Sequence, residues 1–259
     1  MVPIKDLNDY TQKMSLTMKD KLFFVEKIKT SVYIDYGCAD GTLLCELDAI
    51  YNDPNIIYIG YDRSNEMIEL VKSKWGGIGK ILFTSNFEEL LINLQKYKEA
   101  TLILSSVLHE ILSQGIMQDE FWDSLKKLPL KYIVIRDMAY NPIIGQSKFE
   151  RYLVSKMYCK NSKQYSEFCE KFGKITDNIL FCHYLLKYRY TQNWKRELEE
   201  NYFAFDPNFA IEYLTKYRFY PIYLERFNVP YIVETLLKEV QIDLNRFGQT
   251  HIKLIFQKG

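Results

Sequence analysis

Short, continuously apolar segments alternate with segments of helical periodicity along the first half of the chain. Five runs rich in β-branched and aromatic residues predict strands at Val32–Tyr36, Ile56–Tyr61, Ile81–Phe83, Thr101–Leu104 and Tyr132–Ile135. Between them, apolar residues recur every three to four positions, which predicts helices over about 42–52, 66–75, 87–98 and 121–128, after a first helix over 8–29. Apolar strands that alternate with helices are typical of a parallel sheet covered by helices on both faces.

The alternation stops after Asp137, and the remaining sequence predicts a different arrangement. From 147 to 202 the chain is aromatic, basic and helical in pattern, without a convincing strand. Asp206-Pro207 has the form of a helix start, and Asn228-Val229-Pro230 predicts another helix that ends near Lys238. The segments 240–244 and 251–256 then predict an antiparallel hairpin at the edge of the sheet. We therefore expect a core domain over 1–146, a helical insertion over 147–204, and completion of the core by 205–259.

Composition narrows the class of protein. Hydrophobic residues make up 47% of the chain, which is enough for a sizeable core and excludes a disordered protein. No apolar run reaches the ~20 residues that span a bilayer, and the N-terminal sequence lacks the apolar core of a secretory signal. The five cysteines are scattered and form no C-x-x-C pair, so neither a disulfide framework nor a metal site is expected. These features predict a reduced, cytoplasmic protein without a membrane partner, and they leave its oligomeric state open.

A glycine-containing turn follows the first predicted strand. The run Asp35-Tyr36-Gly37-Cys38-Ala39-Asp40-Gly41 has the pattern D-x-G-x-A-x-G and leads directly into a predicted helix. Glycines at such a turn let the backbone approach a ligand without obstruction by a Cβ atom. The two carboxylates would repel a pyrophosphate, but they suit the amino group of a methionine moiety and a sulfonium. The run resembles motif I of class I S-adenosylmethionine-dependent methyltransferases.

This resemblance implies a fold, a cofactor and a set of contacts. The fold would be α/β, a seven-stranded and mostly parallel sheet that binds S-adenosylmethionine, with the helical insertion before the C-terminal hairpin. Asp62 would accept hydrogen bonds from the ribose hydroxyls, and Asn86 would receive the adenine amino group through its side-chain carbonyl. The implied cofactor-binding residues are Asp35, Gly37, Cys38, Ala39, Asp40, Gly41, Asp62, Arg63, Asn86, Ser105 and Ser106.

The residues after the fourth and fifth strands are where the chemistry of methyl transfer is expected. The segment 105–108, Ser-Ser-Val-Leu, differs from the N-P-P-Y sequence of enzymes that methylate nucleobase amines. His109 is the candidate general base because the ordinary pKa of histidine suits proton transfer at neutral pH. The alternative for His109 is that it only begins a helix and packs beside the sheet. Arg136 and Asp137 would either orient a substrate or take part in a structural ion pair.

Residues 148–196 are the most basic part of the chain, with 11 Lys and Arg against 4 Asp and Glu, although the whole chain has a net charge of only +1. Cations interleaved with aromatic rings are typical of a surface for unpaired nucleic acid, but the rings could instead form the core of a small helical domain. The predicted contacts are Lys187, Arg189, Tyr190, Trp194, Lys195 and Arg196. We therefore expect a methyltransferase that acts on nucleic acid, with RNA ahead of DNA. The alternatives are a small-metabolite methyltransferase with the insertion as a lid, and a non-catalytic protein that binds the cofactor or a partner.

Overall fold

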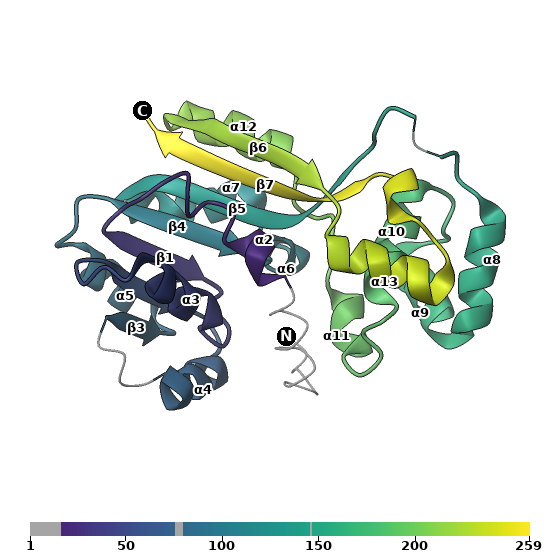
Figure 1. Cartoon of the computed structure of the whole chain (residues 1–259), viewed down its shortest axis with the longest axis horizontal. Helices are drawn as coiled ribbons and strands as arrows, with labels where there is room; N and C mark the ends of the chain where they lie inside the picture. The colour runs from purple at the N-terminus through teal and green to yellow at the C-terminus, as the bar shows by residue number, and fades with distance from the viewer. Residues whose placement is uncertain (1–16, 76–79, 146) are drawn as a thin grey trace.

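The computed structural model describes residues 17–75, 80–145 and 147–259, and these ranges contain one seven-stranded sheet (Figure 1). Its strands are β1 (Val32–Tyr36), β2 (Ile57–Tyr61), β3 (Ile81–Thr84), β4 (Ala100–Ser105), β5 (Leu130–Asn141), β6 (Phe219–Phe227) and β7 (Gln249–Lys258). They lie in the order β3-β2-β1-β4-β5-β7-β6. Each neighbouring pair from β3 to β5 is parallel, whereas β7 runs antiparallel to both β5 and β6. The predicted mostly parallel α/β sheet is thus confirmed.

The sheet is buried on both faces because its strands alternate between two apolar layers. Val32 and Ile34 of β1 pack into one layer, while Tyr33 between them packs into the other. The helices that cover the faces follow the strands in sequence: α3 (Thr42–Tyr51), α4 (Asn65–Trp75), α5 (Phe87–Leu94), α6 (Leu108–Ser113) and α7 (Gln118–Ser124), with a 3₁₀ turn η1 (Leu125–Lys127). Strands that are apolar on both sides require this double cover, as the sequence indicated.

The first predicted helix differs from what the structure contains. Within the described part of that segment only α2 (Met18–Lys21) is helical, and turns follow it up to residue 27. Residues 8–16 of the predicted helix lie outside the described residues. The apolar residues of this segment still pack against the sheet: Met18, Phe23, Phe24 and Ile28. The spacing of apolar residues therefore predicted which side chains are buried, but it did not predict the conformation of the backbone.

The order of the strands shows which edge of the sheet is suited to bind a ligand. The chain moves outward from β1 through β2 to β3, and then crosses back to β4 on the other side of β1. Connections therefore leave the carboxyl ends of β1 and β4 in opposite directions and open a crevice between them. In Figure 1, β5 leads from this edge into a group of helices beyond the sheet.

That helical part has a core of its own. It comprises α8 (Arg151–Lys160), α9 (Ser162–Phe172), α10 (Asn178–Lys187), α11 (Trp194–Glu199) and α13 (Pro230–Val240), while α12 (Pro207–Lys216) packs against β6 and α7. Its buried cluster includes Phe168, Phe181 and Tyr184, and it also takes in Leu236 of α13. Part of the segment 205–259 therefore packs with the helical part and not with the sheet. The start of α12 is as predicted, because the Asp206 side chain accepts hydrogen bonds from two backbone N–H groups of its first turn.

The predicted terminal hairpin is wrong in its first strand. Residues 240–244 contain the end of α13 and the beginning of the 3₁₀ turn η2 (Leu244–Arg246), and the left-handed backbone of Gln241 separates them. Val240 and Ile242 are buried in the helical core, which explains their apolar character. The strand that pairs with β7 is β6, an edge strand that contains Pro221 and is mostly exposed or half-buried. Residues 219–224 form an apolar and aromatic run, but Pro221 interrupts it, and a proline within such a run argues against a strand. No helix among the described residues is long and apolar enough to cross a bilayer.

Candidate functional site

The turn after β1 is fastened to the end of β2. The backbone N–H groups of Gly37 and Cys38 both donate to the carbonyl oxygen of Tyr61, at 2.7 and 3.0 Å. The backbone N–H of Ala39 donates to a carboxylate oxygen of Asp62 at 3.1 Å. The motif I turn and the acid after the second strand, which lie far apart in the sequence, thus form one unit at the carboxyl edge of the sheet.

The glycines of this turn make room for neighbouring side chains. A Cβ atom on Gly37 would lie 2.6 Å from a methyl carbon of Val107, and one on Gly41 would lie 2.4 Å from a methyl carbon of Val71. Both glycines also have positive φ angles, of 83° and 74°. Their lack of a side chain is therefore required by packing and backbone conformation, and their contact with a ligand stays a prediction. Cys38 is likewise buried in a small apolar cluster with Val71.

Asp35 is a buried carboxylate without a hydrogen-bond donor. Its residue is 3% exposed, and no described residue donates a hydrogen bond to it. Burial raises the pKa of Asp35 to about 7, and the nearby Lys21 only partly offsets this effect. A buried, unpaired carboxylate is unfavourable until a cation satisfies it. Asp35 therefore fits the amino group of a methionine moiety at the end of β1.

Asp62 retains acceptor capacity. One of its oxygens accepts from the backbone of Ala39 and the other from the backbone of Ser64 at 2.9 Å, which leaves a second lone pair on each oxygen. These two bonds fix the carboxylate beside the motif I turn, where it fits a pair of ribose hydroxyls. Arg63 points elsewhere and donates to the side chain of Gln114.

Two of the expected cofactor contacts are already engaged. The Asp40 carboxylate accepts from the hydroxyl of Thr42 at 2.7 Å and pairs with Lys74 at 2.8 Å, so its charge is neutralised within the protein. The Asn86 side-chain carbonyl accepts from two backbone N–H groups in the first turn of α5, which makes it the cap of that helix. Asp40 and Asn86 thus have partners within the protein, and their roles toward the methionine amino group and adenine stay predictions.

The end of β4 has unusual backbone and polar contacts. Ser106 adopts a left-handed conformation with φ of 58°, as Ala39 does in the motif I turn with φ of 46°. Left-handed residues other than glycine store strain, and such strain gathers at functional sites. The hydroxyl of Ser106 accepts from Nη1 of Arg136 at 2.8 Å, while the hydroxyl of Ser105 is buried without a partner among the described residues.

His109 of α6 and Asp137 of β5 form a buried pair. Nδ1 of His109 lies 2.6 Å from a carboxylate oxygen of Asp137, and the other oxygen accepts from the backbone of Val107 and Leu108 at 3.0 and 2.7 Å. Burial alone would lower the pKa of His109, but the Asp137 carboxylate outweighs it, and the pKa is raised above its ordinary value. The carboxylate thus fixes the ring and makes it a stronger base.

Arg136 precedes Asp137 on β5 but faces the opposite side of the sheet, because successive side chains alternate along a strand. Arg136 and Asp137 therefore form no ion pair with each other. The Arg136 residue is 4% exposed, and its Nε and Nη2 atoms have no hydrogen-bond partner among the described residues.

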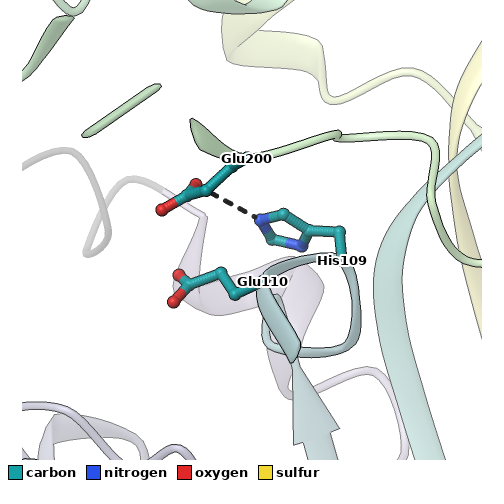
Figure 2. A group of neighbouring side chains, drawn as sticks. All are labelled: His109, Glu110 and Glu200. Carbon is teal, nitrogen blue, oxygen red and sulfur yellow. Dashed lines mark ion pairs between the residues drawn. The ribbon is translucent and has the colours of Figure 1, made fainter. Parts of the chain in front are cut away.

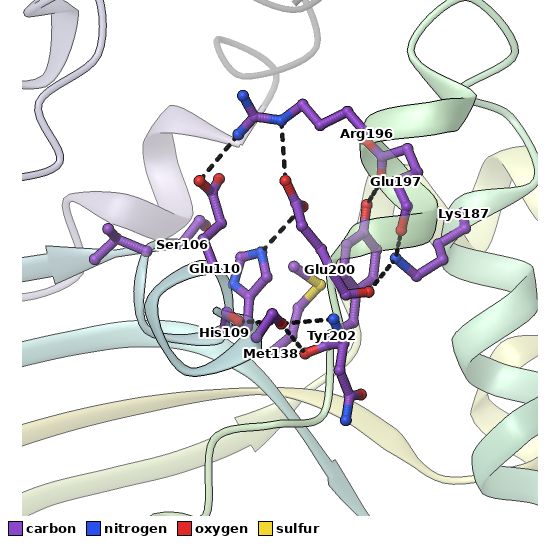
Figure 3. Close-up of polar contacts among 12 residues, drawn as sticks. Ser106, His109, Glu110, Met138, Lys187, Arg196, Glu197, Glu200 and Tyr202 are labelled. Carbon is purple, nitrogen blue, oxygen red and sulfur yellow. Dashed lines mark hydrogen bonds and ion pairs between the residues drawn. The ribbon is translucent and has the colours of Figure 1, made fainter. Parts of the chain in front are cut away.

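Two glutamates face His109 from different parts of the chain (Figure 2). Nε2 of His109 lies 3.8 Å from a carboxylate oxygen of Glu200, and the ligand atoms of His109, Glu110 and Glu200 all lie within 4.8 Å of one another. Such a set could hold a metal ion. However, the Arg196 guanidinium already pairs with both Glu110 and Glu200, at 2.9 Å each (Figure 3). A divalent cation would have to displace this arginine.

These side chains line a cavity of about 110 Å³ between the sheet and the helical part. That volume admits several water molecules or a small polar group. From the core it is lined by Lys21, Ser106, His109, Glu110, Arg136, Met138 and His251, and from the helical part mainly by Tyr190, Arg196, Glu197, Glu200 and Tyr202. The sequence analysis missed Lys21, Glu197, Glu200, Tyr202 and His251. Only the four-residue spacing of Arg196 and Glu200 could have indicated an ion pair.

Three of the predicted nucleic-acid contacts lie in the interior, which corrects their assignment to an open surface. Lys187 is 0% exposed and donates to the backbone carbonyls of Glu197 and Glu200. Trp194 is buried, and its indole N–H donates to Glu167 at 2.6 Å. Arg196 is buried in its two ion pairs.

The other three predicted contacts are more accessible. Arg189 is half-buried and pairs with Glu239 at 3.4 Å, Tyr190 lines the cavity, and Lys195 is exposed. The six residues therefore do not form one continuous basic surface.

Comparisons with known proteins agree with this fold. No known family model and no curated protein sequence matches the chain. Among solved structures, the chain is similar to geranyl diphosphate C-methyltransferase from Streptomyces coelicolor A3(2) in complex with Mg²⁺, geranyl diphosphate and S-adenosylhomocysteine. The two are 8% identical over 99% of this chain and 87% of that chain, with a TM-score of 0.55.

A structure of geranyl diphosphate methyltransferase with geranyl diphosphate and sinefungin is 11% identical over 95% of this chain and 79% of that one, with a TM-score of 0.51. The 16S rRNA methylase ArmA is 19% identical over 62% and 81% of the two chains, with a TM-score of 0.39. The sheet order and the two geranyl diphosphate methyltransferase structures show that the chain has the fold of class I S-adenosylmethionine-dependent methyltransferases.

Proposed function

We propose that the protein is a methyltransferase that uses S-adenosylmethionine and acts on a small acceptor bound in the cavity between the sheet and the helical part. The observation that carries this proposal is the buried His109–Asp137 pair, which places a fixed imidazole on the cavity wall at the carboxyl edge of the sheet. This edge is where α/β sheets bind their ligands.

Two carboxylates fit the cofactor. The unpaired carboxylate of Asp35 would accept the methionine amino group, and the spare lone pairs of Asp62 would accept the ribose hydroxyls. When bound, S-adenosylmethionine supplies a methyl group that its sulfonium makes electrophilic. The protein then needs to align the acceptor and remove its proton.

His109 is suited to proton removal. With Nδ1–H held by Asp137, the neutral ring would present the lone pair of Nε2, which lies 3.8 Å from a carboxylate oxygen of Glu200, to a proton on the attacking atom of the acceptor. Asp137 is the positioning residue, because it holds the ring and stabilises the imidazolium that forms. Its own orientation is fixed by the backbone N–H groups that follow β4.

A small acceptor is favoured over nucleic acid by the position of the basic residues. Lys187 and Arg196 are buried and held by backbone carbonyls and by carboxylates, respectively, so they are not available to phosphates. The cavity itself admits a small group, not a polymer.

Calorimetry with S-adenosylmethionine tests the cofactor assignment. Asp62→Ala should weaken binding by roughly 1–3 kcal/mol because the ribose hydroxyls lose their acceptor. Asp53→Ala, which removes a carboxylate paired with Lys29 away from this edge, should leave affinity unchanged. Equal affinities for wild type and a folded Asp62→Ala protein would contradict the assignment.

Labelled methyl transfer tests the acceptor class. The protein is incubated with methyl-labelled S-adenosylmethionine and either a small-molecule extract or total RNA. Label should enter small molecules with wild type and not with His109→Ala. Label that enters RNA alone would overturn the small-acceptor proposal.

A further inference from the structure

Two hydrogen-bond donors of the Arg136 guanidinium have no partner among the described residues. Nη1 is held by the hydroxyl of Ser106, whereas Nε and Nη2 have no partner in the described parts of the chain. These two nitrogens lie on the same side of the planar group, where they form the fork that binds two oxygens of one anion. The Arg136 residue is only 4% exposed, so bulk water does not readily hydrogen-bond to these two nitrogens.

No described carboxylate forms an ion pair with Arg136. Burial lowers the pKa of Arg136 and the charge of Asp20 offsets this only in part; the Asp20 carboxylate lies 3.6 Å from Nζ of Lys253 and pairs with it. Lys21 and His251 line the same cavity, and repulsion by Arg136 contributes to lowering the pKa of each, after burial. The adjacent carboxylate, Asp137, faces the other side of the sheet and is committed to His109. A buried cation with unpaired donors is unfavourable, and a ligand that pairs them recovers the lost stability.

The charges of the cavity favour an anion with a single charge. The cavity is lined by three cations, Lys21, Arg136 and Arg196, and by three carboxylates, Glu110, Glu197 and Glu200. Arg196 is paired with Glu110 and Glu200, whereas no described carboxylate lies within ion-pair distance of Arg136. One unpaired guanidinium is neutralised by one carboxylate. A phosphate dianion would leave an excess negative charge near the two glutamates.

We propose that this cavity binds an acceptor through a carboxylate, which Nε and Nη2 of Arg136 hold side-on in two parallel hydrogen bonds. The inference rests on the proposed function, since it names the substrate class of the same site: a small carboxylic acid. With its carboxylate on Arg136, the rest of the acceptor lies in the cavity that His109 also lines.

Ligand-observed NMR on the full chain tests this proposal with acetate, the neutral isostere acetamide, and inorganic phosphate. Wild type should bind acetate at least roughly tenfold more tightly than acetamide, because only acetate makes charge-assisted hydrogen bonds. Arg136→Lys keeps the charge but loses the fork, so it should weaken acetate binding by roughly tenfold or more. Arg246→Lys is the matched control, because Arg246 pairs with Glu150 outside the cavity, and it should bind acetate like wild type.

Equal binding of acetate and acetamide by wild type would overturn the proposal without any variant. Unchanged acetate binding by a folded Arg136→Lys protein would also overturn it. Phosphate that binds more tightly than acetate, and is lost in Arg136→Lys, would replace the carboxylate by a phosphate group. The same titrations with and without S-adenosylmethionine separate the two proposals. If acetate binds at Arg136 but S-adenosylmethionine does not bind, the proposed function fails and the anion site stands.

Discussion

Nδ1 of His109 lies 2.6 Å from a carboxylate oxygen of Asp137, and both residues are almost completely buried. This contact joins the first turn of α6 to the middle of β5, two elements that the sequence separates by more than one helix. It also sets His109 apart from the other two histidines of the chain. Burial lowers the pKa of His183 to about 2, and it lowers the pKa of His251 well below the ordinary value.

Only His109 should therefore titrate near neutral pH. In an NMR titration of the three histidine Cε1–Hε1 signals between pH 5 and 9, one signal should move, with a midpoint above about 6.5. Asp137→Asn should shift that midpoint to lower pH, because it removes the charge that stabilises the imidazolium. Two or more titrating signals, or a midpoint unaffected by Asp137→Asn, would contradict this account.

The raised pKa of His109 also implies that the stability of the protein depends on pH. A histidine whose folded pKa exceeds its unfolded pKa stabilises the protein below the unfolded value, and this contribution is lost as the pH rises through the folded value. The stability difference between wild type and Asp137→Asn should thus shrink as the pH rises above the His109 midpoint. Urea unfolding at several pH values measures it.

Gly37 and Val107 should be coupled through packing. Gly37→Ala should destabilise the protein by roughly 1–3 kcal/mol, because its Cβ would overlap Val107 and its φ is positive. Val107→Ala should recover part of this loss in the double variant, since it removes the overlapping methyl groups. The measurement is a double-mutant cycle by urea unfolding. Strict additivity would show that the overlap with Val107 is not the cause.

Replacing Lys187 should lower the stability of the fold and should not change any affinity for nucleic acid. Its ammonium group is buried between the carbonyl oxygens of Glu197 and Glu200 and lies 3.7 Å from the centre of the Tyr202 ring. Lys187→Met leaves these two buried carbonyls without a donor and should cost roughly 1–3 kcal/mol of folding free energy for each. Lys195→Met is the matched control in the same segment, because Lys195 is exposed, and it should change stability by less than about 0.5 kcal/mol. Thermal unfolding distinguishes the two, and an unchanged melting temperature for Lys187→Met would contradict the buried role.

The sequence predicted those features that depend on neighbours along the chain. β1 and β4 are buried on both faces, so most of their residues are apolar, and these short apolar runs reveal the strands. The D-x-G-x-A-x-G turn is likewise a local pattern, and it lies at the carboxyl edge of the sheet as expected. β6 was missed because Pro221 interrupts its apolar run and argues against a strand, although an edge strand tolerates a proline.

The roles of the charged residues could not be predicted, since they depend on partners that are distant in sequence. Lys187 and Arg196 lie in a sequence that is typical of a basic surface. In the structure they are buried, and they contact the Glu110 carboxylate and polar groups of residues 197–200. The unpaired state of Arg136 follows only from the positions of all its neighbours. Asp40 shows the converse, because a residue with the right motif position is satisfied by Lys74 of the next helix.

A ribosome makes β7 after the other six strands, yet β7 lies between β5 and β6 in the sheet. Until residues 249–258 emerge, β5 has an open edge, and β6 lacks the one strand that it pairs with in the described structure. The whole helical part is synthesised in the meantime. Closure of the sheet is therefore a late step of long sequence separation, during which the nascent chain exposes an unpaired strand edge that is open to non-native pairing.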